Sequence, residues 1–297
     1  MKVFYSPRYE ISLPGHIWPT SKYRLIAGRL PQPTIEPSLA AWDDLALVHA
    51  PEYLEKLRAN SLTSHDIATL ELPWAPELAD AFRLMVGGTI AAAAAALDDG
   101  RGAHLGGGLH HAFAGHGEGF CPLNDVAVAI RVLQRAPARV PPSPHPAVRR
   151  AAIVDLDVHH GNGTAMIFER DDSVFTFSMH QQHNYPLFKP RGDLDIGLED
   201  GTRDDRYLAL LADALPRVMA SRPDVVFYLA GADPFERDRL GGLKLTKAGL
   251  AERDRLVIAA ARAAAVPLVT VLAGGYAADV NDTVDIHAAT IQLMLRN

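Results

Sequence analysis

The segment that most constrains the fold is 151–164, with the sequence AAIVDLDVHHGNGT. Its apolar start predicts a buried strand of a parallel sheet. Asp155, Asp157 and His159 then follow at every second position, so an extended backbone would direct all three to one side. Two carboxylates and an imidazole cannot be packed as core without a cation, water or partner groups, because buried unpaired charge is costly. The alternative is a solvated polar strand end.

The composition sets the class of protein. Of the 297 residues, 48% are hydrophobic and 22% are charged, which is typical of a globular protein with a sizeable core. A formal net charge of −6 argues against non-specific nucleic-acid binding, which needs a basic surface. The single cysteine, Cys121, excludes an intramolecular disulfide and a multi-cysteine zinc site. With no apolar signal core and no apolar run of about 18 residues, we expect a cytoplasmic protein that does not engage a membrane.

Short apolar runs alternate with helical patterns, which is typical of βαβ units and a mostly parallel sheet. Strands are predicted at 2–5, 151–154, 173–178, 223–229 and 266–272, and helices at 22–29, 51–59, 77–97, 124–132, 206–220, 247–265 and 283–295. The alanine-rich end of the 77–97 helix is expected to pack closely on the sheet. The segments 61–73 and 179–202 are predicted to be a connection and a loop. We therefore expect one three-layer α/β/α domain over residues 1–297, with a proline-rich surface insertion near 135–147.

Polar residues follow three of the predicted strands. Asp157 and His159 come after the first, Asp233 after the strand at 223–229, and Tyr276 after the last. Ligands of parallel sheets bind beyond the carboxyl ends of the strands, so these residues are expected in one site. Asp157, His159 and Asp233 suit a catalytic zinc, which takes three protein ligands and leaves a position for water. A ligand set without thiolate would also accept Fe(II) in place of zinc.

A histidine pair supplies the base that such a centre needs. His110 or His111, in the glycine-rich segment 103–125, is the candidate to take a proton from the activated water. Asp155 and Asn162 are suited to bond the far nitrogens of the pair and to fix their tautomers. Tyr276 can donate a hydrogen bond to the oxyanion as it forms. Taken alone, a histidine pair is more often structural than catalytic.

Four long segments carry a resemblance to a known family. They are GGLHHAFAGHGEGFCPLNDVAVAI, VDLDVHHGNGT, LAGADPFERDRLGGLKLT and LAGGY. In this order they resemble the signature blocks of the zinc-dependent histone deacetylase family, and the likeness runs from about residue 8 to residue 280. The opening of the chain and the segment 183–202 are most similar to class IV-type and bacterial members. The resemblance implies an arginase–deacetylase fold with zinc at the base of a narrow tunnel.

The resemblance also implies a role for each matching residue. Asp157, His159 and Asp233 match the zinc ligands, and Asn162 stands where some members have aspartate. The other implied roles are His111 as general base and acid, His110 as its electrostatic companion, Tyr276 as the carbonyl-polarising tyrosine, Gly119 and Phe120 as the tunnel wall, Asp155 and Ser178 as part of a structural potassium site, and Arg24 as an arginine at the foot of the channel.

The favoured function is a metal-dependent amidohydrolase that removes an acetyl or longer acyl group from the ε-amino group of lysine by attack of zinc-bound water. One alternative keeps the site and takes small acylated amines such as acetylpolyamines, which an acid-lined, constricted entrance would favour. The other is an inactive metal-binding partner module, against which the intact set of ligands, histidines and tyrosine argues. The expected partner is thus an acyl-lysine peptide or protein, or a small acylated amine.

Overall fold

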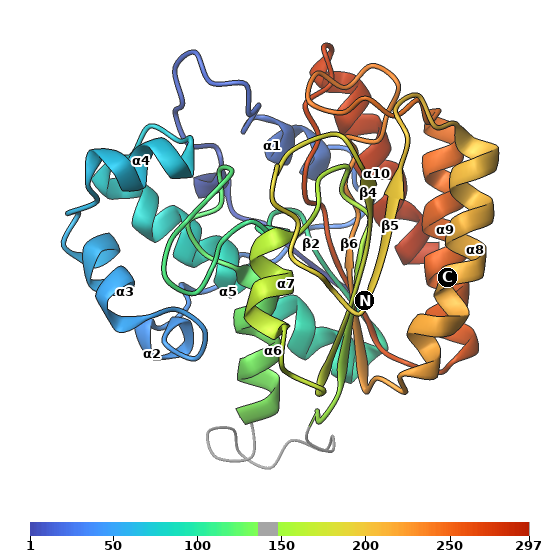
Figure 1. The fold of residues 1–297 in the computed structure, drawn as a ribbon, viewed down its shortest axis with the longest axis horizontal. Helices are drawn as coiled ribbons and strands as arrows, with labels where there is room; N and C mark the ends of the chain where they lie inside the picture. The colour runs from blue at the N-terminus through green and yellow to red at the C-terminus, as the bar shows by residue number, and fades with distance from the viewer. Residues whose placement is uncertain (136–147, 297) are drawn as a thin grey trace.

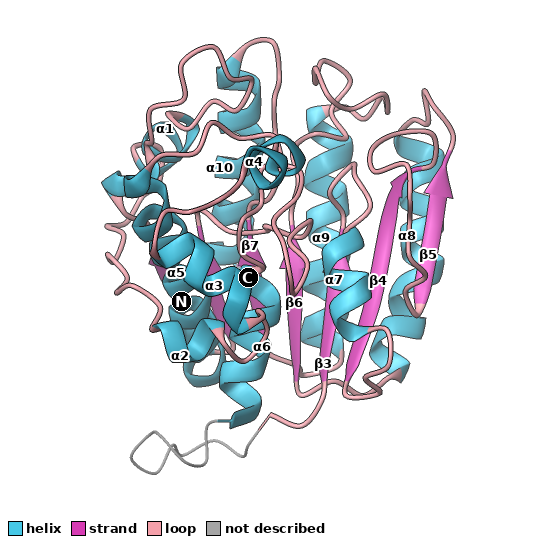
Figure 2. Ribbon diagram, turned by 60° about the vertical axis from the view of Figure 1, so that its left-hand side comes forward, coloured by secondary structure: helices cyan, strands magenta, loops and turns pink. Residues whose placement is uncertain are grey.

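The computed structural model describes residues 1–135 and 148–296, and its described strands form one parallel sheet. The strand order is β1-β2-β7-β6-β3-β4-β5, with every neighbouring pair parallel. Figure 2 shows the strands running the same way toward a crowded set of loops at the top. The strands are β1 (Lys2–Phe4), β2 (Arg101–His104), β3 (Ala151–Asp155), β4 (Val174–Gln181), β5 (Leu194–Leu198), β6 (Val225–Leu229) and β7 (Leu268–Val271).

Helices cover both faces of this sheet. Figure 1 shows α5, α6 and α7 on one side and α8, α9 and α10 on the other, so the three-layer α/β/α architecture is confirmed. The helices are α1 (Lys22–Ala27), α2 (Trp42–Leu45), α3 (Pro51–Arg58), α4 (Ser64–Leu70), α5 (Pro76–Asp99), α6 (Asp125–Arg135), α7 (Asn162–Phe168), α8 (Asp204–Ala220), α9 (Lys247–Ala263) and α10 (Val280–Arg296). We keep a single domain over residues 1–297 as a proposal. The predicted surface insertion lies, beyond its first residue, outside the described residues.

Helix α5 shows how small residues bring a helix onto the sheet. Pro76 stands in its first turn, and Gly100, with a φ of 75°, ends it. A methyl group on Gly102 of β2 would lie 2.0 Å from the backbone oxygen of Ala92, so helix and strand approach too closely for a larger residue. By length and composition alone α5 could span a membrane, but two thirds of its most apolar window is buried within the protein. It is a core helix, and the expected close packing of its alanines is confirmed.

The central strands are the most buried part of the sheet. All five residues of β3 and all five of β6 are buried. Alternate side chains along each strand pack under the α5–α6 layer or under the α8–α9 layer. Continuous apolar strands with both faces covered are what a parallel sheet between two helical layers requires. The sheet centre is therefore a rigid base for the loops that follow β3, β6 and β7.

Two of the predicted connecting segments contain regular structure. The stretch 179–202 is not one loop, because β4 continues to Gln181 and β5 pairs with it from Leu194 to Leu198. The edge strand β5 alternates apolar residues with Asp195 and Gly197, and the aspartates at 193 and 195 disguised the pattern. The connection 61–73 contains α4, which a capping box between Thr63 and Asp66 initiates.

Candidate active site

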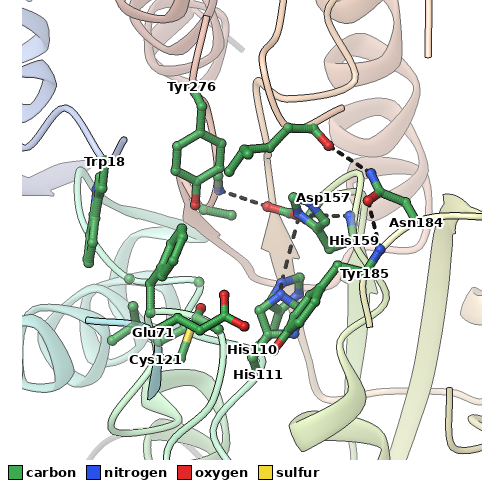
Figure 3. Close-up of a pocket in the computed structure, with 18 of the residues that line it drawn as sticks. Trp18, Glu71, His110, His111, Cys121, Asp157, His159, Asn184, Tyr185 and Tyr276 are labelled. Atoms are coloured by element: carbon green, nitrogen blue, oxygen red, sulfur yellow. Dashed lines mark hydrogen bonds and ion pairs between the residues drawn. The ribbon is translucent and has the colours of Figure 1, made fainter. Parts of the chain in front are cut away.

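The carboxyl ends of three adjacent strands bring the predicted site residues together. Asp157 and His159 follow β3, Asp233 follows β6, and the turn that leads to Tyr276 follows β7. Because β7, β6 and β3 are neighbours and parallel, residues far apart in sequence meet at one edge of the sheet. Figure 3 shows Asp157, His159 and Tyr276 around one pocket with His110.

Asp157, His159 and Asp233 form a buried group of potential metal ligands. One donor atom from each lies within 4.8 Å of the other two. His159 Nδ1 is 3.0 Å from an oxygen of Asp157 and 3.6 Å from Oδ2 of Asp233. That Asp233 oxygen has no hydrogen-bond partner among the described residues, although it is buried. A buried, unpartnered carboxylate oxygen facing an imidazole and a second carboxylate fits a divalent cation well.

Backbone groups fix the two carboxylates from behind. The amide of Gly274 donates to Asp157 over 2.8 Å, and the amide of Val158 donates to the second oxygen of Asp233 over 2.9 Å. Burial, together with the charge of Asp157, raises the pKa of Asp233 above its ordinary value. Burial opposes protonation of His159, but the adjacent carboxylates outweigh it and raise its pKa. The group thus concentrates negative charge that a cation would neutralise.

The histidine pair lies beside this group, with each ring held by its own acceptor. His110 Nδ1 is 2.7 Å from Asp155, and His111 Nδ1 is 2.7 Å from the amide oxygen of Asn162. The Nε2 atoms of the two rings are 3.1 Å apart. Burial opposes a charge on His110, but Asp155 and Asp157 raise its pKa to about 9. Burial and the positive charge of His110 instead lower the pKa of His111, so His111 is the neutral member.

The pocket above the group is narrow and aromatic. It encloses about 260 Å³, and its lining includes the expected wall residues Gly119 and Phe120. Both have positive φ, 52° and 69°, and a methyl group on Gly119 would lie 2.8 Å from the His111 ring. Tyr185 forms the opposite wall, with its ring 4.9 Å from that of His111 (Figure 3). An extended apolar chain with a polar end would fill such a pocket.

Tyr276 closes one side of the pocket. Its backbone amide donates to Asp238 over 2.7 Å, and its ring lies edge-to-face with Phe120 at 6.1 Å. Burial, with the negative charges of Asp157 and Asp233, raises the pKa of its hydroxyl well above the ordinary value. The phenol therefore stays protonated and can only lose its proton with difficulty, which suits a hydrogen-bond donor.

Comparisons with known proteins decide the family. The model of the histone deacetylase domain matches residues 20–291. The chain belongs to the histone deacetylase family. Relatives include a protein of Picosynechococcus, 42% identical over 96% of this chain and 95% of its own, and histone deacetylase 2 of Arabidopsis thaliana, 33% identical over 93% and 74%. A probable deacetylase of Methanothermobacter thermautotrophicus is 32% identical over 81% and 76%.

A solved structure supports the fold of the family. The HD domain of HDA15 covers 100% of this chain with a TM-score of 0.79, at 24% sequence identity over 91% of its own length. The arginase–deacetylase type of fold is therefore confirmed. Family membership supports a hydrolase with deacetylase activity in general and an acylated substrate.

Arg24, the cation expected at the foot of this deacetylase pocket, does not lie there. The Arg24 side chain is 58% exposed and pairs with Glu10 at the surface, so its expected place at the foot of the channel is wrong. Lys22 and Arg24 are two positions apart on α1, so their side chains lie on opposite sides of the helix. Lys22 is the buried one. Its Nζ donates to the backbone oxygen of Ala273 over 3.1 Å and lies 5.6 Å from the centre of the Tyr276 ring. Burial lowers the pKa of Lys22 to about 8.

Asp155 and Ser178, the expected potassium-site residues of the family, are paired in register across β3 and β4. Ser178 Oγ lies 2.9 Å from His180 Nδ1, while Asp155 holds His110. That they bind potassium stays a prediction.

Sequence reasoning missed Tyr185, Lys22 and a further carboxylate, Glu118, behind Asn162. None stands at a strand end, which is the signal that located Asp157, His159, Asp233 and Tyr276.

Proposed function

We propose that this deacetylase-family protein is a zinc-dependent amidohydrolase that removes acyl groups from the ε-amino group of lysine. The observation that carries the proposal is the buried Asp157–His159–Asp233 group, with an Asp233 oxygen that no described residue satisfies, at the bottom of a narrow pocket. We further propose that the protein works in the cytoplasm, for the reasons of composition given above.

The three buried residues would hold the ion. Two carboxylates and one imidazole are acceptable donors for zinc and also for Fe(II). When bound, such an ion lowers the pKa of water and polarises a carbonyl group. The fixed backbone donors behind Asp157 and Asp233 keep the ligands in place before the ion arrives.

The residues around the ligands would move the protons. His111 is neutral and held through Nδ1 by Asn162, so its Nε2 is the atom that accepts a proton from water and returns it to the departing amine. His110, which carries positive charge beside Asp155, stabilises the negative charge that develops next to it. The Tyr276 hydroxyl donates a hydrogen bond to the former carbonyl oxygen.

The substrate pocket supports a lysine side chain. Gly119, Phe120 and Tyr185 offer a narrow apolar passage to the four-carbon stem, which would place its acylated nitrogen near His111. The rim carries Glu71, whose carboxylate has no hydrogen-bond or ion-pair partner in the described chain. That free acidic group favours a substrate with a second positive charge, so a small acylated polyamine remains the second candidate.

The test is a panel of fluorogenic peptides that carry acetyl through long fatty acyl groups on lysine. We expect hydrolysis of at least one acyl length, its loss after treatment with a chelator, and its return on addition of zinc. Acetylpolyamines added as competitors separate the two substrate classes. A correctly folded protein that hydrolyses none of these amides would contradict the proposal and favour the inactive partner module.

A further inference from the structure

A carboxylate stands behind the residue that holds His111. Glu118 Oε1 accepts a hydrogen bond of 2.6 Å from the amide nitrogen of Asn162 and one of 3.1 Å from the hydroxyl of Tyr185. Its second oxygen lies 3.5 Å from His116. Two backbone hydrogen bonds between Glu118 and Cys121 form a tight bridge that fixes the segment. The Glu118 side chain is 21% exposed, so the carboxylate is largely enclosed by these donors.

An ionised carboxylate can only accept hydrogen bonds. Partial burial opposes its charge, but the hydrogen bonds from His116, Asn162 and Tyr185 outweigh burial and lower the pKa of Glu118. The Asn162 amide must therefore turn its nitrogen toward Glu118 and its oxygen toward His111. The orientation of the amide thus follows from the chemistry of its partners, independent of how oxygen and nitrogen are assigned.

We propose that Glu118 is a positioning residue, which sets the orientation of the Asn162 amide and through it the tautomer of His111. An amide oxygen facing Nδ1 of His111 requires a proton on Nδ1. The free electron pair then stays on Nε2, the atom that faces His110. This inference deepens the proposed function and rests on the role of His111 as the base.

The other end of the network agrees with this arrangement. Asp155 is also an acceptor, so His110 donates to it through Nδ1, and protonated His110 can donate through Nε2 to His111. Along the network that runs from Asp155 through the two histidines and Asn162 to Glu118, every hydrogen bond then joins one donor to one acceptor. Because a carboxylate accepts at each end of this network, Nε2 of His111 is the acceptor in the contact between the two rings.

Removing the charge of Glu118 releases the amide. In Glu118→Gln the new side chain has the same shape but can offer an oxygen or a nitrogen to Asn162. Asn162 can then flip and turn its nitrogen toward His111, which moves the ring proton to Nε2 and removes the base. Asparagine cannot lock the tautomer alone, because its two ends are nearly equal in shape.

The first test compares steady-state kinetics on the best acyl-lysine peptide. We expect Glu118→Gln to lower kcat by about 10- to 100-fold, as loss of outer partners of catalytic groups typically does, with KM changed less than twofold. The double variant Glu118→Gln/Asn162→Asp should recover most of kcat, because the introduced carboxylate accepts from His111 in either orientation and the introduced glutamine amide donates to that carboxylate. The matched control is His116→Gln, which removes another partner of Glu118 and should leave kcat unchanged.

The second test needs no activity. In protein labelled with ¹⁵N-histidine and free of metal, the His111 signals, assigned from their absence in His111→Gln, should show the proton on Nδ1. In Glu118→Gln the proton should move to Nε2 in a substantial fraction of molecules, and in the double variant it should return.

The outcomes separate this inference from the proposed function. If the wild-type protein hydrolysed none of the amides, the proposed function would be wrong. The tautomer signals of His111 would still test the positioning role of Glu118. An unchanged tautomer and unchanged kcat in Glu118→Gln overturn the inference. A loss confined to KM would mark Glu118 as a substrate contact, and a loss of kcat that the double variant does not recover would mark it as structural, so either result also overturns it.

Discussion

Adding one methyl group at residue 274 should prevent the proposed metal site from binding its ion. In Gly274→Ala, the added carbon would lie 1.9 Å from Oδ2 of Asp233 and 2.5 Å from Oδ2 of Asp157, where ordinary contacts begin at 3.4 Å. The Asp233 carboxylate must therefore retreat by about 1.5 Å, whereas coordination distances tolerate about 0.2 Å. The backbone conformation is one that alanine adopts. The Asp157 oxygen that the added carbon approaches is the one that accepts from the residue 274 amide, so this hydrogen bond is weakened as well.

We expect zinc affinity to fall at least about 100-fold, which is the upper range for loss of outer support of metal ligands, and acyl-lysine hydrolysis to fall with it. The metal-free variant should stay folded, less stable by about 1–3 kcal/mol because of overpacking. Competition with a chromophoric chelator measures the affinity, and thermal unfolding measures the fold.

The control for this prediction is Gly115→Ala. A methyl group there meets no atom within 4 Å, so zinc affinity and turnover should equal those of wild type. If Gly274→Ala also binds zinc with wild-type affinity, then Asp157 and Asp233 do not share an ion, and the reasoning fails.

Three further predictions concern chemistry and stability. Tyr276→Phe should bind zinc normally and lose about 100- to 1,000-fold in kcat, which titration with metal and steady-state kinetics would measure. Burial lowers the pKa of His49 from 6.5 to about 4. Between these two pH values the imidazole is protonated in the unfolded chain and neutral in the folded protein. The free energy of unfolding should therefore fall by up to about 3 kcal/mol as the pH drops from above 6.5 to below 4. Urea denaturation should show this slope reduced in His49→Gln. Asp254→Asn leaves the buried Arg253 without its anion and should cost about 3–5 kcal/mol in the same assay, whereas Glu10→Gln at the surface should cost nothing measurable.

Strand ends explain why much of the site could be predicted. In a parallel sheet the carboxyl ends share one edge, so the residues after three apolar runs had to meet once the strands were neighbours. Asp157, His159 and Asp233 do lie together, and Asp155 and Asn162 do hold the histidine pair. Their metal-binding and catalytic roles stay predictions.

Other features carry no periodic signal. Lys22 and Arg24 lie on one short helix, and which of them is buried depends on how α1 packs against α10 and the β7 loop. Strand β2 has only four residues, one of them glycine, so no apolar run marks it. Glu118 acts through Asn162, a contact between residues 44 positions apart that only the folded chain creates.

The proposed ligand set has a consequence for how the protein acquires its ion. Asp157 and His159 are neighbours in the unfolded chain, but the contact of Asp233 with the Val158 amide spans 75 residues and that of the Gly274 amide with Asp157 spans 117. Closing such long loops is entropically costly, so these contacts form when the middle of the sheet assembles and not before. The unfolded chain offers a metal ion only two neighbouring donors, Asp157 and His159, so the ion could not direct the early steps of folding. The ion would bind the folded protein, so the supply of metal would govern how many folded copies are active.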